Sequence, residues 1–122
     1  MKRFNILLFS LIIAFSFSSC DKEKGDNLLV TVKYQGKIID QPMVYLKMGT
    51  STNPNIALYK YDQSGSGDAQ GQVYFENLKA TTYFIYAKGY SSEAKIGVQG
   101  ESSVSIIERS CQNEYKITIE VK

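Results

Sequence analysis

Apolar and polar residues alternate with a period of two along most of the chain after residue 27, which is the pattern of half-buried β-strands. Leu28, Val30 and Val32 fall on one face of the first such stretch, and Val44 and Leu46 fall on one face of the next. The stretches are 28–34, 43–48, 56–61, 72–76 and 82–88, a weaker one at 95–99, and then 103–108 and 114–121, which we expect to pair as a closing hairpin. Seven or eight short strands in so short a chain predict an all-β sandwich.

Two further features of the pattern define the expected core and its longest loop. In the stretch 56–61, Ile56 and Leu58 are expected to point inward, as are Tyr83, Ile85 and Ala87 in the stretch 82–88. Residues 62–71 are rich in Asp, Gln, Ser and Gly and hold a single apolar residue, an alanine. This composition predicts a surface loop.

The first nineteen residues have the order of a secretory signal peptide. Lys2 and Arg3 form a basic start, and residues 6–17 form an apolar stretch. A transmembrane helix needs about 20 apolar residues, and this stretch ends earlier, at a pair of serines. We therefore expect residues 1–19 to be removed.

The junction that follows, Phe17-Ser18-Ser19-Cys20, resembles the lipobox of bacterial lipoproteins, although that motif more often has Leu where Phe17 stands. The resemblance implies that Cys20 receives a thioether-linked diacylglycerol. Two or three acyl chains anchor a protein stably, because each buried methylene contributes about 0.8 kcal/mol. The alternative is an ordinary secretory signal that leaves Cys20 as a thiol.

Residues 20–27 consist of this cysteine and a highly charged stretch with no apolar side chain to bury, which predicts a solvated tether. Charge-rich segments in this place resemble the surface-export signals of Bacteroidota lipoproteins, whereas Asp21 directly after the cysteine resembles the inner-membrane retention signal of enteric bacteria. A plain spacer is the remaining interpretation. We expect an outer-membrane lipoprotein, with the domain 28–122 facing either the cell surface or the periplasm.

Charge and cysteine content narrow the classes of function. Loss of Lys2 and Arg3 with the signal peptide lowers the 14 basic residues to 12, equal to the 12 acidic residues. A neutral mature chain lacks the clustered positive charge of a nucleic-acid-binding protein. Once Cys20 is acylated, Cys111 is the one remaining cysteine, so no intramolecular disulfide is expected. Cys111 can be either a partly shielded residue without a function or a reactive thiol, and the sequence does not distinguish the two.

Residues 28–90 resemble the transthyretin or prealbumin-like β-sandwich, in particular the carboxypeptidase-regulatory-like domains of secreted bacterial proteins. The stretches that carry the resemblance are 30–46, with a glycine-containing turn, Asp68-Ala-Gln-Gly71 followed by a short strand, and Tyr83-Phe-Ile-Tyr-Ala87. Thr81 departs from the family, which usually has Gly there. The resemblance implies a seven- or eight-stranded, Ig-like sandwich, and its motifs specify packing rather than chemistry.

The residues that catalysis needs are scarce. The chain has no histidine, which removes the usual nucleophile and base pairs and the zinc sites built from Cys and His. Residues 62–73 begin like a calcium loop, but Val73 stands where the closing Glu is needed. Hydroxyisourate hydrolysis, known on transthyretin-like folds, relies on histidine and arginine. We expect no catalytic residues, no metal and no cofactor, and hence not an enzyme.

The best candidate for a binding site is a set of aromatic residues that alternation places on the outer surface of one sheet. They are Tyr45, Tyr59, Tyr61, Phe84 and Tyr86. Such a face suits a protein partner or sugar stacking, although cross-strand pairing that only stabilises the sheet is the alternative. We expect an envelope-anchored module that mediates protein or matrix interaction, or alternatively a glycan-binding surface lipoprotein; the oligomeric state is not readable.

Overall fold

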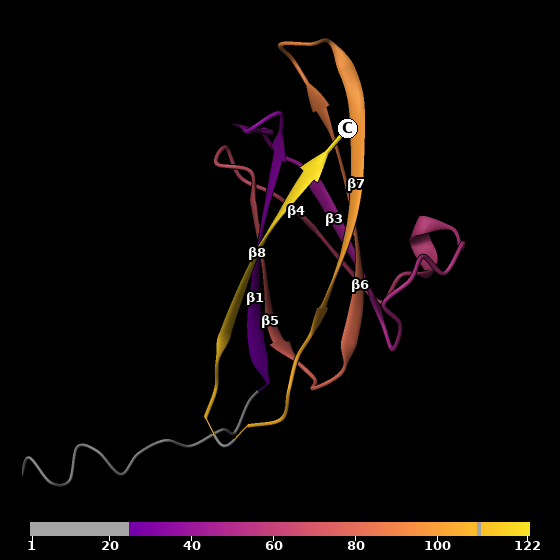
Figure 1. Cartoon of the computed structure of the whole chain (residues 1–122), viewed down its shortest axis with the longest axis vertical. Helices are drawn as coiled ribbons and strands as arrows, with labels where there is room; N and C mark the ends of the chain where they lie inside the picture. The colour runs from indigo at the N-terminus through magenta and orange to yellow at the C-terminus, as the bar shows by residue number, and fades with distance from the viewer. Residues whose placement is uncertain (1–24, 110) are drawn as a thin grey trace, which may run out of the picture.

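Eight strands form two four-stranded sheets in the computed structural model, which describes residues 25–109 and 111–122 (Figure 1). The strands are β1 (Asp26–Tyr34), β2 (Lys37–Ile38), β3 (Met43–Met48), β4 (Gln63–Ser66), β5 (Gln72–Leu78), β6 (Thr82–Ser91), β7 (Ile96–Ser105) and β8 (Glu114–Val121), with a 3-10 helix η1 (Leu58–Lys60). The predicted all-β sandwich is confirmed. The signal peptide, Cys20 and residues 21–24 of the tether lie outside the described residues. The end of the predicted tether is wrong, because Asp26 and Asn27 begin β1 and Asp26 is fully buried.

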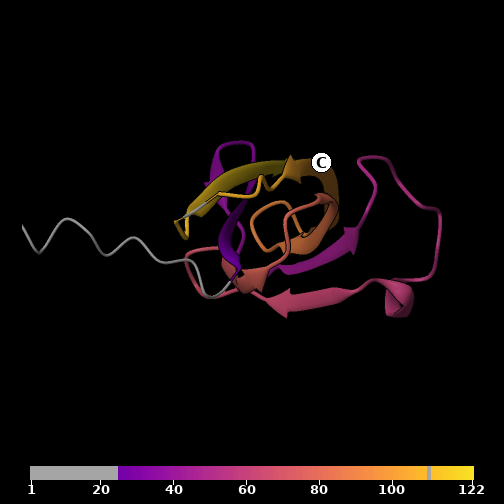
Figure 2. The same cartoon turned by 90° about the horizontal axis from the view of Figure 1, so that it is seen from below.

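The two sheets are built around β1 and β6. In sheet A, β1 pairs antiparallel with β2 and β5 and parallel with β8. Sheet B has the strand order β4-β3-β6-β7, with antiparallel pairs throughout. The sheets also meet at one edge, where the backbones of Gln99 in β7 and Lys122 after β8 exchange two hydrogen bonds of 3.1 and 2.9 Å. Figure 2 shows the layers from one end.

The core lies between the sheets and consists of the inward half of each alternating strand. Leu28, Val30 and Val32 from β1 and Val44 and Leu46 from β3 are fully buried. The other buried residues of this cluster are Ile39, Val73, Phe75, Leu78, Tyr83, Ile85, Ala87, Val98, Ile106, Ile119 and Val121. Period-two alternation therefore placed the inner face correctly in the predicted strands 28–34, 43–48, 72–76 and 82–88.

Five of the predicted strands are confirmed, with extended ends in three of them, but the one at 56–61 is wrong. Leu58–Lys60 is a 3-10 helix, and Ile56 and Leu58 are half-buried rather than core residues. The reason lies in the pairing of β3, whose neighbours in sheet B are β6 and β4. The segment between β3 and β4 instead projects from one side of the sandwich (Figures 1 and 2).

The predicted surface loop at 62–71 is wrong in part, because its first half contains β4. This edge strand holds no apolar side chain, and Gly65 shows why a small residue is needed. A Cβ atom on Gly65 would lie 2.7 Å from Cγ1 of Val73 in sheet A. The two sheets approach too closely here for a larger inward side chain, so the strand lacks the signal by which strands are recognised.

The predicted closing hairpin is also wrong. Residues 103–105 end β7 and pair with Thr82–Phe84 in β6, and the weak candidate at 95–99 is the start of the same ten-residue strand. The last strand, β8, is placed correctly along the chain but lies beside β1 in parallel, where Ile119 and Val121 are buried. Parallel pairing joins distant segments, which local alternation does not reveal.

The Asp68 to Gly71 turn has the geometry that its sequence indicates. Asp68 Oδ1 accepts hydrogen bonds from the backbone N–H groups of Gln70 (2.9 Å) and Gln72 (3.0 Å). Gly71 has φ +72°, which favours glycine, and its carbonyl accepts from the Val32 N–H at 2.9 Å. The Asp68 carboxylate thus serves the turn that starts β5.

Candidate functional site

The outer face of sheet B carries four aromatic rings in mutual contact, which we call the aromatic cluster: Tyr45, Tyr61, Phe84 and Tyr86. The ring centroids of Tyr45 and Tyr61 are 5.9 Å apart with an edge-to-face angle of 62°. Tyr45 and Tyr86 are 6.0 Å apart at 38°, and Tyr61 and Phe84 are 6.5 Å apart at 40°. Such tilted pairs are within the range of favourable ring contacts, worth about 0.5–1.5 kcal/mol each beyond their buried area.

Strand pairing and one carboxylate bring these rings together. Tyr45 in β3 lies directly opposite Tyr86 in β6. Tyr61 precedes β4 and is fixed through its neighbour Asp62, whose N–H donates to the Leu46 carbonyl at 2.9 Å. Asp62 Oδ2 in turn accepts from the Met48 N–H at 2.6 Å. Asp62, the first residue of the stretch that resembles a calcium loop, therefore uses its carboxylate to hold the end of the segment 49–62 against β3.

Exposure differs sharply within the predicted aromatic set. Phe84 is 2% exposed, although its neighbours along β6 point into the core, so it is covered on the outer face. Tyr45, Tyr61 and Tyr86 are half-buried. Tyr59 is 84% exposed on η1. The accessible part of the cluster is therefore its three tyrosines.

Tyr59 reaches the face by a different route from the one predicted. It lies on η1 rather than on a strand, so the alternation argument for it was wrong. It nevertheless lines, with Tyr45 and Tyr61, an open depression of about 360 Å³ beside the aromatic cluster. The structure thus brings all five predicted residues to one region, with Phe84 beneath the surface and Tyr59 at the margin.

Charged and polar side chains border the aromatic cluster. Lys88 Nζ lies 5.9 Å from the centroid of the Tyr45 ring, which is within cation–π range. The Tyr86 hydroxyl donates to Gln99 Oε1 at 2.6 Å, and Glu101, opposite Tyr86 in β7, accepts from Asn53 Nδ2 at 2.9 Å. An aromatic centre with a polar border is the usual anatomy of a protein–protein interface.

The electrostatics of the face favour a neutral Tyr61. Burial, and then the negative charges of Glu101 and of ionised Tyr86, raise the pKa of Tyr61 above its ordinary 10.0. Its hydroxyl therefore stays protonated at neutral pH and can both donate and accept hydrogen bonds. In the part of the chain that the structure describes, no group of three or more His, Cys, Asp or Glu residues is arranged to hold a metal ion.

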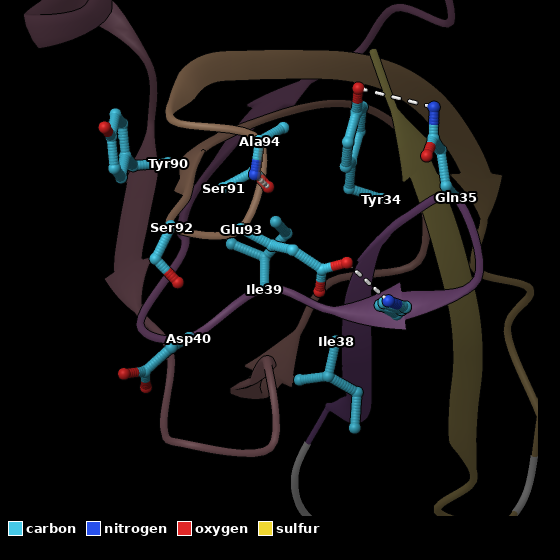
Figure 3. Close-up of a pocket in the computed structure, with 11 residues that line it drawn as sticks. Tyr34, Gln35, Ile38, Ile39, Asp40, Tyr90, Ser91, Ser92, Glu93 and Ala94 are labelled. Carbon is cyan, nitrogen blue, oxygen red and sulfur yellow. Dashed lines mark hydrogen bonds and ion pairs between the residues drawn. The ribbon is translucent and has the colours of Figure 1, made fainter.

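Sequence reasoning missed a second concave site, which we call the tip cavity. It has a volume of about 270 Å³ and lies between the turn that joins β1 to β2 and the turn that joins β6 to β7 (Figure 3). Lys37 Nζ and Glu93 Oε1 form an ion pair of 2.6 Å across it. Its residues come from turns more than fifty positions apart, so no local pattern could have indicated that they meet.

Cys111 differs from expectation, because it carries a disulfide in the structure. The expectation of no intramolecular disulfide assumed prior acylation of Cys20, and a thioether sulfur cannot also form a disulfide. Cys20 itself lies outside the described residues. Among the described residues no helix is long and apolar enough to cross a bilayer.

Comparison with known proteins adds little to this description. No family model matches the chain, and a search of curated proteins finds no match either. Among solved structures, the chain is similar to a “putative carbohydrate binding protein (PA1324) from Pseudomonas aeruginosa”, with a TM-score of 0.46 and 11% identity over 86% of this chain and 95% of that one. A similarity of this size carries no argument about ligand or activity.

Proposed function

We propose that this protein is a non-catalytic envelope lipoprotein, held at the outer membrane by an acylated Cys20, whose β-sandwich binds a protein or matrix partner. The observation that carries the proposal is the aromatic cluster on the outer face of sheet B. Tyrosine offers a large, rigid contact surface with a polar tip and loses little conformational entropy on binding. Interfaces concentrate their binding energy in such side chains.

The arrangement of the rings favours a protein partner over a glycan chain at this face. The three ring contacts are tilted by 38° to 62°, so the tyrosines form an uneven surface rather than a flat platform for successive sugar rings. Lys47, Lys88 and Glu101 supply charges of both signs around it. Mixed charges at the border select a partner by complementarity, which affects specificity and association rate more than affinity.

Glycan binding on the same face is the second candidate. The observation in its favour is the open depression lined by Tyr45, Tyr59 and Tyr61, beside the amide and carboxylate groups of Gln63 and Asp62. A single sugar residue, unlike a chain, could contact one ring without needing its neighbours to be parallel to it. The two candidates therefore differ in the ligand captured rather than in the residues used.

Removal of two central tyrosines tests the proposal. The double variant Tyr45→Ser/Tyr86→Ser should lose partner capture from solubilised envelopes after cross-linking, because each hot-spot tyrosine contributes about 2 kcal/mol or more. Tyr74→Ser is the matched control, since Tyr74 is 46% exposed on β5 of the other sheet. Equal capture by wild type and the double variant would refute this binding face, and glycan-array binding without protein capture would favour the second candidate.

A mass measurement tests the anchor. In the proposed mature chain the Cys20 sulfur carries diacylglycerol, and the intact mass of protein extracted from membranes should exceed that of residues 20–122 by this lipid and any N-acyl chain. Cys20→Ser should remove the added mass and release the protein from the membrane fraction. The anchor would be contradicted by a chain without lipid whose mass is two hydrogens below the mass calculated from its sequence, because a disulfide between its two cysteines removes two hydrogens.

A further inference from the structure

The tip cavity lies at the end of the sandwich opposite to the end at which β1 begins (Figure 1). The turn between β1 and β2 and the turn between β6 and β7 both reach this end. A chain tethered through the residues before β1 would therefore present the cavity away from its point of attachment. This position suits a ligand that approaches from outside.

The cavity has an apolar base and a polar border. The buried Ile39 and the half-buried Tyr34 ring, which packs against the core, provide the base. Gln35, Lys37 and Glu93 provide the border, and Figure 3 shows Tyr34 on one side of the cavity and Glu93 next to Ile39. The amide both donates and accepts, the ammonium donates, and the carboxylate accepts. A ligand with several hydroxyl groups, each both donor and acceptor, matches this border.

The charges at the cavity disfavour an anionic ligand. Lys37 and Glu93 are paired at 2.6 Å, with side chains 68% and 72% exposed, and the exposed Asp40 adds a second carboxylate to the lining. An anionic ligand would have to compete with Glu93 for Lys37 and would also face the negative charge of Asp40. A neutral diol, in contrast, can donate to the carboxylate and accept from the ammonium while the pair stays intact. Because an exposed pair is worth only about 0–1 kcal/mol, small shifts to admit the ligand cost little.

The size of the cavity limits the ligand to about one ring. Pockets for drug-sized molecules have volumes of about 300–1,000 Å³, and the tip cavity, at about 270 Å³, lies just below that range. We propose that the tip cavity binds a single neutral sugar residue, such as the end of a glycan, with its apolar face over Tyr34 and Ile39 and its hydroxyls at Lys37 and Glu93. This site is separate from the aromatic cluster and does not depend on it.

Binding of defined sugars to the full-length lipoprotein in detergent micelles tests the site. The probes are an array of neutral and charged mono- and oligosaccharides, followed by calorimetry with the neutral sugar that binds best. Glu93→Gln and Lys37→Gln should each weaken binding about tenfold or more, as expected for loss of a hydrogen bond to a charged group. Glu76→Gln, an exposed position on β5, should bind like wild type.

Two controls keep this test independent of the aromatic cluster and of stability. The variant Tyr45→Ser/Tyr86→Ser should keep wild-type sugar affinity, and both tip variants should keep the wild-type thermal midpoint because their side chains are exposed. The proposal is overturned if no neutral sugar binds, if only charged sugars bind, or if the tip variants bind the sugar as tightly as wild type. Loss of sugar affinity in the aromatic variant alone would also overturn it.

Discussion

Gly71→Ala should destabilise this domain far more than Gly36→Ala, although both glycines have a positive φ. Gly36, in the turn after β1, has φ +77° and nothing within 4 Å of an added Cβ. Gly71, before β5, has φ +72°, and an added Cβ would lie 2.8 Å from the Ile39 carbonyl oxygen and 2.9 Å from that of Val32. The pair of variants separates backbone strain from steric conflict.

The expected magnitudes follow from these surroundings. At Gly36, an alanine in the left-handed conformation destabilises the folded state by about 1–2 kcal/mol. Alanine also makes the unfolded chain less flexible, which stabilises the folded state by about 0.4–1 kcal/mol. The net loss in the free energy of unfolding is then about 1 kcal/mol. At Gly71 the same loss is joined by overpacking, which costs about 1–3 kcal/mol. The Val32 carbonyl cannot move away freely, because it accepts a hydrogen bond from the Ile39 N–H at 3.1 Å. We expect a total of about 2–4 kcal/mol.

Urea unfolding followed by far-UV circular dichroism measures both losses, since the chain contains no tryptophan for fluorescence. Each kcal/mol should lower the thermal midpoint of a domain of this size by about 4–8 °C. Equal losses in the two variants would refute the close approach of Gly71 to β1 and to the segment after β2. A changed m-value would instead indicate a change in the unfolded or native state.

Two further predictions concern buried or partly buried tyrosines. Tyr83 is fully buried and its hydroxyl donates to the Lys79 carbonyl at 3.0 Å, so Tyr83→Phe should cost about 1 kcal/mol in urea unfolding; an unchanged midpoint would show that this bond contributes nothing. Burial and the charge of Glu101 raise the pKa of Tyr61 in the folded protein. The contribution of Tyr61 to the free energy of unfolding should therefore be full below about pH 10, the pKa of an unfolded tyrosine, and should fall as pH rises through the folded-state pKa. Tyr61→Phe should flatten this alkaline decline in midpoints measured between pH 8 and pH 12, and an identical slope in both proteins would contradict the assignment.

The strands that could be predicted from sequence are those whose inward residues are large. Val44 and Leu46, or Tyr83 and Ile85, alternate with polar or aromatic residues, and burial of one face fixes their orientation. β4 could not be predicted, because Gly65 is required where the sheets approach each other and a glycine resembles a turn. The pairing of β8 with β1 could not be predicted either, because it depends on contacts between the two ends of the domain.

The candidate site was predictable to the same extent as the strands beneath it. Tyr45 and Tyr86 were placed together by alternation in two true strands that pair with each other. Tyr61 joins them through the backbone hydrogen bonds of Asp62, and Tyr59 stands on a 3-10 helix, so the pattern that selected both does not explain their position. Burial of Phe84 on an outward face required the three-dimensional arrangement to be known.

Site-specific photo-cross-linking in intact cells tests most directly whether the outer face of sheet B is the binding face. A photoreactive amino acid at position 59, where Tyr59 is 84% exposed beside the aromatic cluster, can report a partner without removing a ring of the cluster. The same group at position 74 reports on sheet A. We predict a discrete adduct from position 59 that is absent from position 74 and lost in the Tyr45→Ser/Tyr86→Ser background. An adduct from position 74 alone, or one from position 59 that survives in that background, would contradict the account.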